Sequence, residues 1–286
     1  FCLSRGLGDV YKRQMLAFIA AGIGNLIRTK LIKHHFTLFL NIAVSISASC
    51  FIYAALLKIA EMAFNVSTIH EAGYICSMLF IIPGFPFITS GIDLAKLDLR
   101  SGLERLAYAI IIVMVATMFA WIMALLLQLK PMDFEDLDLG PVLHLILRLI
   151  MSFFGVFGFS IMFNSPASMA ATAALIGAIA NSLRLELVDL TGMPAPAAAF
   201  AGALTAGLLA SFIKENNGYP RISLTVPSIV IMVPGLYLYR AIYNFGIMAL
   251  SDAVSWFASA IMIIIALPLG LIFARILTDK TFRYCT

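Results

Sequence analysis

The chain has 286 residues, of which 62% are hydrophobic and only 12% are charged, and its mean hydropathy is +1.00. Soluble domains carry roughly 25% charged residues, so this composition excludes a soluble globular protein and predicts an integral membrane protein with the lipid bilayer as a partner. The net charge of +4 comes from short basic clusters between apolar runs and not from one basic face, so it does not indicate nucleic-acid binding, and no nucleic-acid partner is expected.

Nine apolar runs, counting interrupted ones, are read as membrane helices, for which about 17 to 25 residues are needed. The first is shorter than a full span, and its beginning is expected to be missing. The fold class is therefore predicted to be an all-α polytopic membrane protein. In chain order the runs are 15–27, 36–57, 74–92, 106–129, 141–163, 166–183, 194–213, 222–239 and 252–277.

The segment before the first run differs from everything after it. Residues 4–14, SRGLGDVYKRQ, look like the translation of a transposon-end adapter used in DNA sequencing libraries. We therefore expect residues 1–14 to be an adapter-derived artefact and leave them out of the fold. The natural protein is then expected to extend upstream of Met15. The alternative is a short basic tail.

A proline-glycine pair interrupts two of the runs, at Pro83-Gly84 and at Pro234-Gly235. Proline removes a backbone donor and clashes with the preceding turn, while glycine tolerates dihedral angles that other residues avoid. In a bilayer, such a break persists only where protein or a water-filled cavity satisfies the freed backbone groups. Interrupted segments at corresponding positions of two halves indicate the substrate site of a transporter.

An internal repeat is predicted when the two breaks are aligned. The sequence NLIR begins at Asn25, 58 residues before Pro83, and NSLR begins at Asn181, 53 residues before Pro234. Each is interpreted as the end of a helix, followed by a full span, a broken span, a connector and a long helix. The period of five helices is odd, so we expect an inverted repeat with two membrane modules, residues 15–130 and 141–286, and broken helices near the midplane.

The orientation in the membrane is predicted from lysine and arginine in alternate loops. Eleven fall on the side of Arg28 and four on the side of Arg184. The first side, with the C-terminus, is therefore predicted to be cytoplasmic. One further helix upstream of Met15 would bring the number of spans to ten.

The stretches LFIIPGFPFITSGID (79–93) and VPSIVIMVPGLYLYR (226–240) resemble the signatures of the two membrane modules of the threonine/serine exporter family. Phe163-Asn164, followed by ALIGA at 174–178, is similar to the opening of the second module. The resemblance implies a secondary exporter of the bacterial inner membrane that moves threonine and serine by alternating access, driven by protons. The family's N-terminal soluble portion and first helix are not in this sequence.

Other readings of the function stay open. Relatives with separate modules are associated with dicarboxylates such as succinate, so the substrate could be an organic acid instead of an amino acid. A passive channel would also tolerate broken helices. The sequence is compatible with a homo-oligomer but does not indicate one.

An amino acid needs donors for its carboxylate and acceptors for its ammonium group, and the ends of broken helices supply both. The alternative for the prolines and glycines is a kink that only aids packing. For Thr89 and Ser90, the alternative is a hydrogen bond to their own helix. The predicted substrate-binding residues are Pro83, Gly84, Pro86, Thr89, Ser90, Pro234, Gly235, Tyr237 and Asn164.

Ionisable residues in the spans are expected to be functional because they are costly in a bilayer. We predict Asp93 to be the proton-coupling residue, with an interfacial charge paired to Lys96 or Arg100 as the alternative. Arg240 is predicted to be the charge partner of an anion. For Arg148 we favour a side chain that extends to the interface.

Neither a metal nor a cofactor is expected. The four cysteines, Cys2, Cys50, Cys76 and Cys285, form no C-x-x-C pair and no Cys/His cluster, so neither a disulfide framework nor a zinc site is indicated. The chain also has no H-E-x-x-H, no G-x-S-x-G and no phosphate-binding loop, so it is not expected to be an enzyme.

Overall fold

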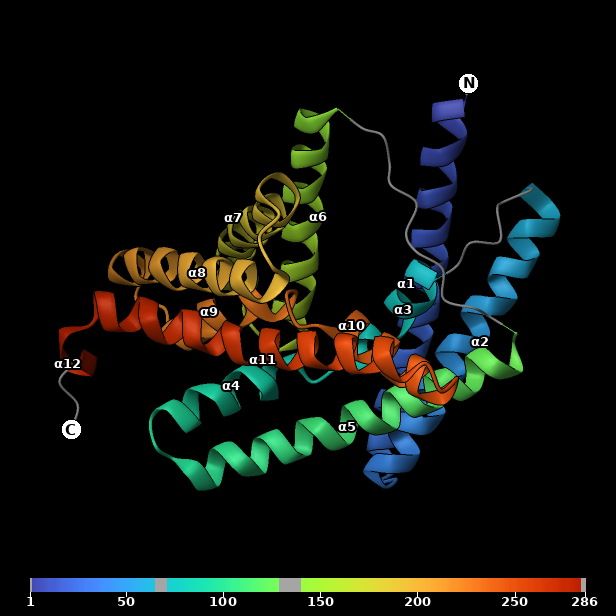
Figure 1. The fold of residues 1–286 in the computed structure, drawn as a ribbon, viewed down its shortest axis with the longest axis horizontal. Helices are drawn as coiled ribbons and strands as arrows, with labels where there is room; N and C mark the ends of the chain where they lie inside the picture. Colours follow the sequence, from blue (N-terminus) through green and yellow to red (C-terminus); the bar gives the residue numbers. More distant parts are fainter. Residues whose placement is uncertain (1, 65–70, 129–139, 284–286) are drawn as a thin grey trace. The chain divides into compact units, whose positions relative to one another are not determined.

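A computed structural model describes residues 2–64, 71–128 and 140–283 of the chain. Across these ranges the chain forms helices and no strands (Figure 1). In chain order the helices are α1 (Cys2–Lys33), α2 (Leu38–Phe64), α3 (Glu71–Met78), the 3₁₀ turn η1 (Leu79–Ile81), α4 (Gly84–Ala95), α5 (Leu99–Leu126), α6 (Pro141–Met162), α7 (Ala167–Thr191), α8 (Ala195–Asn217), α9 (Arg221–Val230), α10 (Gly235–Gly246), α11 (Leu250–Thr278) and α12 (Lys280–Arg283).

The predicted all-α polytopic fold is confirmed, and the described part of the chain holds seven to nine candidate spans. Seven helices are long and apolar enough to cross a membrane, and two bent helix pairs bring the number to nine. The pairs are α3–η1 with α4, bent by 57°, and α9 with α10, bent by 44°. Each bend falls on a predicted proline-glycine break. Long apolar runs become helices because only a helix satisfies its own backbone polar groups in lipid.

Helices α1 and α7 continue past the ends that the sequence suggested. The prediction that NLIR and NSLR end their helices is wrong, because α1 continues to Lys33 and α7 to Thr191. Leucine, lysine, arginine and glutamate favour helices, and Lys30 and Lys33 lie in the last turn of α1, where cations are favourable. Helix α7 ends only at Gly192, which adopts the left-handed conformation with φ 65°. The side chains of the two arginines therefore project from helices and do not lie in loops.

The chain divides into two compact units that we describe separately. The first unit comprises Phe1–Pro83, Ile110–Asp138 and Gly235–Phe257. The second unit comprises Gly84–Ala109, Leu139–Pro234 and Ala258–Thr286. The division passes between the proline and the glycine of both breaks. Each unit therefore holds the first half of one broken span and the second half of the other.

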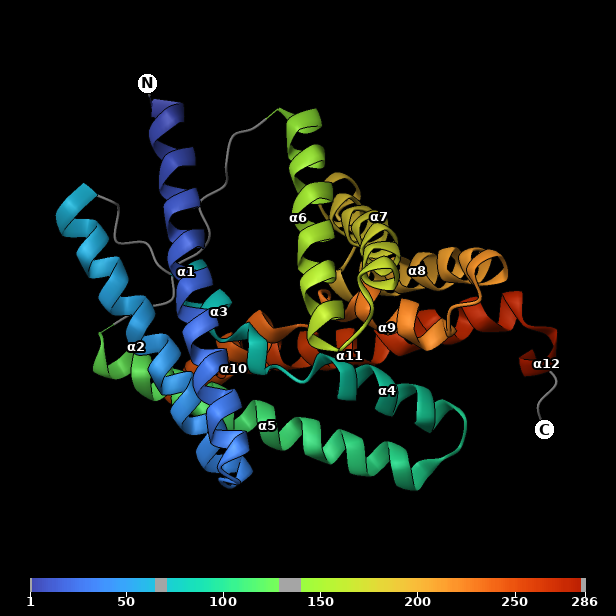
Figure 2. The same ribbon diagram turned by 180° about the vertical axis from the view of Figure 1, so that it is seen from behind.

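In the first unit, α1 packs along α2 and α3, and the two views in Figures 1 and 2 show α1 and α2 side by side. Buried hydroxyl groups tie these helices together. Ser49 Oγ lies 3.0 Å from Ala20 O and 2.6 Å from Ser77 O. The buried Tyr74 hydroxyl donates to Ala120 O of α5 at 2.6 Å. The hydroxyl groups of Ser49 and Tyr74 thus join helices of this unit by hydrogen bonds to backbone carbonyls.

In the second unit, α7 packs against α6, α8 and α9, and both views show α6 and α7 adjacent. Small residues allow these helices to approach closely. A Cβ atom on Gly177 would lie 2.8 Å from Ser228 O, and one on Gly270 of α11 would lie 2.6 Å from Phe200 O of α8. Neither position has room for a side chain.

A further close contact joins α4 to α11 in the second unit. Pro268 lies inside α11 and is buried. Its ring occupies the space that a side chain at position 91 would need, so only Gly91 allows α4 to lie against it.

We predict that Gly270→Ala destabilises the protein, because the new methyl group would overlap the backbone of α8. Overpacking of this kind costs about 1–3 kcal/mol, which should lower the melting temperature measured in detergent. Gly158→Ala is the matched control, since a Cβ atom at that exposed helical position meets nothing within 4 Å. Equal melting temperatures for the two variants would contradict the assigned α8–α11 contact.

Candidate functional site

The two breaks close with the same backbone hydrogen bond. In the first, Ile82 N donates to Leu79 O at 3.1 Å, and in the second, Val233 N donates to Val230 O at 3.1 Å. In a regular α-helix these two carbonyls would accept from the residue four positions on, which is a proline in both breaks. Proline has no N–H to give, so each half-helix closes with a tighter 3₁₀-type bond.

Gly235 begins α10 and lies against the end of η1 in the first unit. A Cβ atom there would collide with the side chain of Ile82 and lie 3.3 Å from Leu79 Cδ2. Both residues belong to the turn that closes the other break. The N-terminal end of α10 and the carbonyl end of η1 are thus neighbours within one unit.

The second unit has the equivalent arrangement, in which the glycine of the first break packs against the residues that precede the second break. A Cβ atom on Gly84, the first residue of α4, would lie 2.8 Å from Val230 Cγ2 and 3.3 Å from Val233 Cγ2. These two valines stand at the same distances before Pro234 as Leu79 and Ile82 stand before Pro83. At both positions, packing leaves no room for a side chain. The contacts are reciprocal, because the glycine of each break packs against the residues that precede the other break.

The first amides of a helix have no acceptor within that helix. In α10 these include the N–H groups of Gly235 and Leu236, and in α4 those of Gly84 and Phe85. Pro86 follows in the first turn of α4, where the missing N–H costs little. Each unit thus brings backbone donors next to the carbonyl end of a half-helix, although the residues of the break itself are apolar.

Thr89 and Ser90 are buried in α4 and bond to their own helix. Thr89 Oγ1 donates to Phe85 O at 3.0 Å, and Ser90 Oγ donates to Phe87 O at 2.8 Å. The structure therefore shows the hydrogen bonds to their own helix that the sequence analysis gave as the alternative for these two residues. Their hydroxyl oxygens keep the capacity to accept a hydrogen bond.

The other two predicted residues of the second broken span lie together in the first unit. The Tyr237 ring packs edge-on against Trp256 of α11, with centroids 5.2 Å apart. The Arg240 guanidinium lies over the same indole, 4.8 Å from its centroid. Arg240 is therefore part of an aromatic cluster one helical turn after the break.

Asn164 lies apart from these residues. It is exposed in the turn after α6 and has a φ of 59°. Asparagine tolerates this left-handed conformation better than most residues, so the turn accounts for its residue type without a ligand.

Asp93 forms an ion pair near the end of α4. Its Oδ2 lies 3.1 Å from Arg105 Nη1, and its side chain is 19% exposed while that of Arg105 is 50% exposed. The partner is thus Arg105 and neither Lys96 nor Arg100. The reason is the tight turn after α4, which returns α5 along it so that Arg105 faces Asp93, while Arg100 pairs with Glu104 on the surface of α5.

Arg148 forms a second charged cluster, which the sequence did not predict. In the second unit it donates from Nη1 to Glu186 Oε1 at 2.7 Å and from Nη2 to Asp189 Oδ2. The sequence favoured a side chain that extends to the interface, and the structure adds two carboxylates of α7 that bind it. The sequence could have indicated this cluster, because Glu186 and Asp189 are three residues apart and therefore share one helix face.

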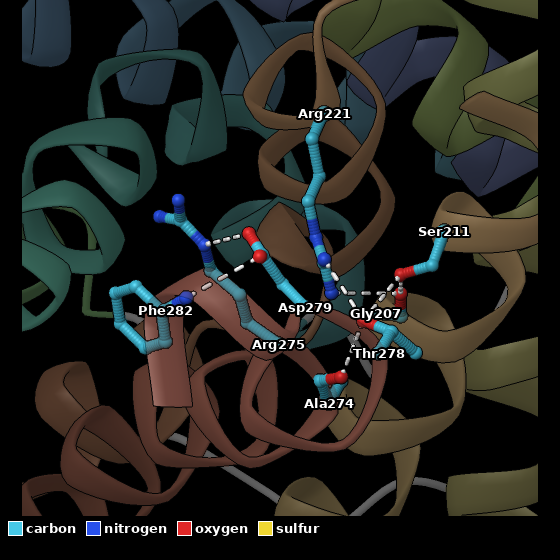
Figure 3. A network of polar contacts seen from close by, with 8 residues as sticks. All are labelled: Gly207, Ser211, Arg221, Ala274, Arg275, Thr278, Asp279 and Phe282. Carbon is cyan, nitrogen blue, oxygen red and sulfur yellow. Dashed lines mark hydrogen bonds and ion pairs between the residues drawn. The ribbon is translucent and has the colours of Figure 1, made fainter. Parts of the chain in front are cut away.

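Figure 3 shows a third polar cluster, where α8, α9 and α11 end or begin in the second unit. Arg221 donates to Thr278 Oγ1 at 3.0 Å and to Gly207 O at 3.3 Å. Arg275 Nε lies 3.5 Å from Asp279 Oδ2. Two basic residues that the charge count placed on one side, Arg221 and Arg275, thus lie in the same cluster. Among the described residues, no group of three or more His, Cys, Asp or Glu could hold a metal ion.

Seven long apolar helices and two helix pairs bent at matching proline-glycine pairs, all within the described residues, define a polytopic membrane protein. Two family models match the chain, one over residues 1–128 and the other over 148–277, and both are described as threonine/serine exporter. The chain belongs to the threonine/serine exporter family, a family of transporters, and has its two-module arrangement. Neither the comparison with curated proteins nor that with solved structures gives a match.

We predict that Arg148→Met destabilises the protein, because it leaves Glu186 and Asp189 without their shared cation. Breaking a buried pair costs about 3–5 kcal/mol, and partial exposure should reduce this to about 1–3 kcal/mol. Arg100→Met is the control, since that arginine and Glu104 are 91% and 67% exposed. Thermal unfolding in detergent should therefore show a lower melting temperature for Arg148→Met only, and similar values would contradict a stabilising role for the cluster.

Proposed function

We propose that this protein is a secondary exporter of threonine and serine in the bacterial inner membrane, with its C-terminus in the cytoplasm. The observation that carries the proposal is the pairing of helix ends in each unit. A donor end, at Gly235 or Gly84, lies against the carbonyl end of the other broken span. The family match supports the substrate class.

The chemistry of this pairing suits a zwitterion. A carboxylate needs N–H donors, which the first turns of α10 and α4 offer together with the positive end of the helix dipole. An ammonium group needs acceptors, and the carbonyls at the end of η1 and α9 are placed beside those turns. A substrate hydroxyl could reach Thr89 or Ser90, whose oxygens can still accept. The site is therefore built mainly from backbone.

The reciprocal contacts also favour an inverted repeat. Each break closes with the same hydrogen bond and places the same two positions against the glycine of the other break. Two equivalent structural elements of opposite direction allow a carrier to expose one site to either side in turn. We therefore propose alternating access as the mechanism.

We further propose that Asp93 couples export to protons. Its carboxylate is mostly buried and its ion-pair partner, Arg105, is half exposed. Protonation of Asp93 would remove the attraction to Arg105 and free the end of α4, which begins at the first break. Proton binding and the position of a half-helix would thus be linked.

The second candidate is a dicarboxylate exporter. The observation that favours it is Arg240, a cation inside the second broken span that rests on Trp256. A guanidinium near the start of α10 would suit a second carboxylate better than the side chain of threonine.

Counterflow in vesicles that contain the full-length natural protein tests the proposal. We expect saturable uptake of labelled threonine or serine into vesicles preloaded with the same amino acid. Saturable counterflow of succinate alone would favour the dicarboxylate exporter. Flux proportional to the driving force, without saturation, would indicate a channel, and no flux of any of these solutes would refute a transport function for them.

Gly84→Leu and Gly235→Leu should each reduce counterflow at least about tenfold, because a side chain at either position pushes the helix start away from the paired carbonyl end. Gly158→Leu, in open space on α6, should transport normally. Amounts of inserted protein are compared in the same vesicles. Normal counterflow in both break variants would show that the breaks do not form the site.

Asp93→Asn should abolish export driven by a pH gradient but leave counterflow, because an amide cannot carry the proton yet keeps the shape of the carboxyl group. Asp98→Asn, in the exposed connector after α4, is the control. Unchanged dependence on the pH gradient in Asp93→Asn would remove Asp93 from the coupling mechanism.

A further inference from the structure

The Arg28 side chain reaches the first broken span. Its Nη1 donates to the backbone carbonyl of Phe80 at 3.0 Å, across 52 positions of the sequence. Arg28 lies on α1 and Phe80 in η1, the last turn before the break, and both belong to the first unit. An arginine that the sequence placed in a loop is therefore attached to the centre of a membrane span.

The carbonyl of Phe80 needs this donor because of the break. In a continuous α-helix it would accept from the N–H of residue 84. Gly84 instead begins α4, which departs at 57°. Phe80 is partly buried, and a carbonyl that lacks a partner is costly in apolar surroundings. A guanidinium supplies a charge-assisted bond and also places a cation at the negative end of the half-helix. Arg28 thus replaces a backbone hydrogen bond that the break removes.

The packing of α1 fixes this contact. Gly24 precedes Arg28 by one helical turn, and a Cβ atom there would lie 2.8 Å from Ser49 Cβ and 2.9 Å from the ring of Phe80. Only glycine lets α1 approach η1 so closely. The arginine is therefore held by the helix itself at a fixed distance from the carbonyl.

The second repeat has an arginine at the corresponding place. Arg184 ends NSLR as Arg28 ends NLIR, and it lies on α7 in the second unit. A Cβ atom on Gly202 would lie 3.2 Å from Arg184 Cβ and 3.3 Å from Met232 Sδ. Arg184 thus also stands beside the last residues before a break, and its Nε donates to Asn181 Oδ1 at 3.1 Å.

We propose that Arg28 is a positioning residue of the transporter. It holds the carbonyl end of η1 in place, and with it Leu79 and Ile82, the two residues against which Gly235 and the donor end of α10 pack. Arg28 acts through the backbone of Phe80 and not by contact with the substrate. This inference rests on the proposed function, because it assumes that the paired helix ends bind the substrate.

The test measures the half-saturation concentration for threonine counterflow in vesicles containing the full-length protein. Arg28→Lys, Arg28→Gln and Arg28→Leu form a series that keeps a charged donor, keeps a neutral donor and removes the donor. We expect the half-saturation concentration to rise in that order, by about tenfold or more for Arg28→Leu, with a smaller change in the maximal rate. Lys30→Leu, on the exposed part of the same helix, should match the unmodified protein.

A second measurement does not depend on transport. The variant Ile82→Cys is labelled with a membrane-permeant maleimide in a protein that also carries Cys2→Ser, Cys76→Ser and Cys285→Ser, which leaves only the buried Cys50 besides the new thiol. Loss of the Arg28 bond should loosen the end of η1, so adding Arg28→Leu should speed labelling several-fold, and adding Lys30→Leu should not.

The outcomes separate the two proposals. If the unmodified protein shows no counterflow of threonine or serine, the proposed function fails. Faster labelling in Arg28→Leu would still support the role of the Arg28 hydrogen bond in holding the end of η1. If counterflow is present and Arg28→Leu has the normal half-saturation concentration, or if its labelling is unchanged, the role given to Arg28 is wrong.

Discussion

The structure depends on one constraint, which is that every backbone polar group inside an apolar span must find a partner. Continuous helices meet it by themselves, but the two proline-glycine breaks do not. Leu79 O and Val230 O lose a helical donor to a proline, and each recovers one from the residue just before that proline. Phe80 O has no backbone donor of this kind and accepts a hydrogen bond from Arg28 of another helix. The breaks are therefore stable because the surrounding residues complete them.

The same constraint explains how the polar side chains are used. Thr89, Ser90 and Ser228 all donate to carbonyls of their own helix, so hydroxyl groups in the described spans are rarely left for lipid. Arg148 is likewise paired with two carboxylates of α7. The hydrogen-bond donors of these side chains are therefore already engaged. This favours binding by the ends of helices, where backbone groups remain available.

Much of the fold could be predicted from the sequence, because a long apolar run in lipid satisfies its backbone polar groups by forming an α-helix. The nine spans and both bends follow from hydropathy and from Pro83 and Pro234. Helix ends could not be predicted as well, because Arg28 and Arg184 look like loop charges until their helices are seen to continue. Pairings across the chain, such as Asp93 with Arg105 or Arg28 with Phe80 O, depend on how helices pack. A single sequence states no distances, so only the residue types could be anticipated.

The contact between Gly91 and Pro268 limits how this family can change. The proline ring fills the volume that any side chain at position 91 would occupy, so the two sites form one spatial unit although 177 positions separate them. Substitution at one site is tolerable only together with substitution at the other. Among relatives, a bulkier residue at position 91 of α4 should occur together with a residue other than proline at position 268 of α11. The two positions should therefore covary.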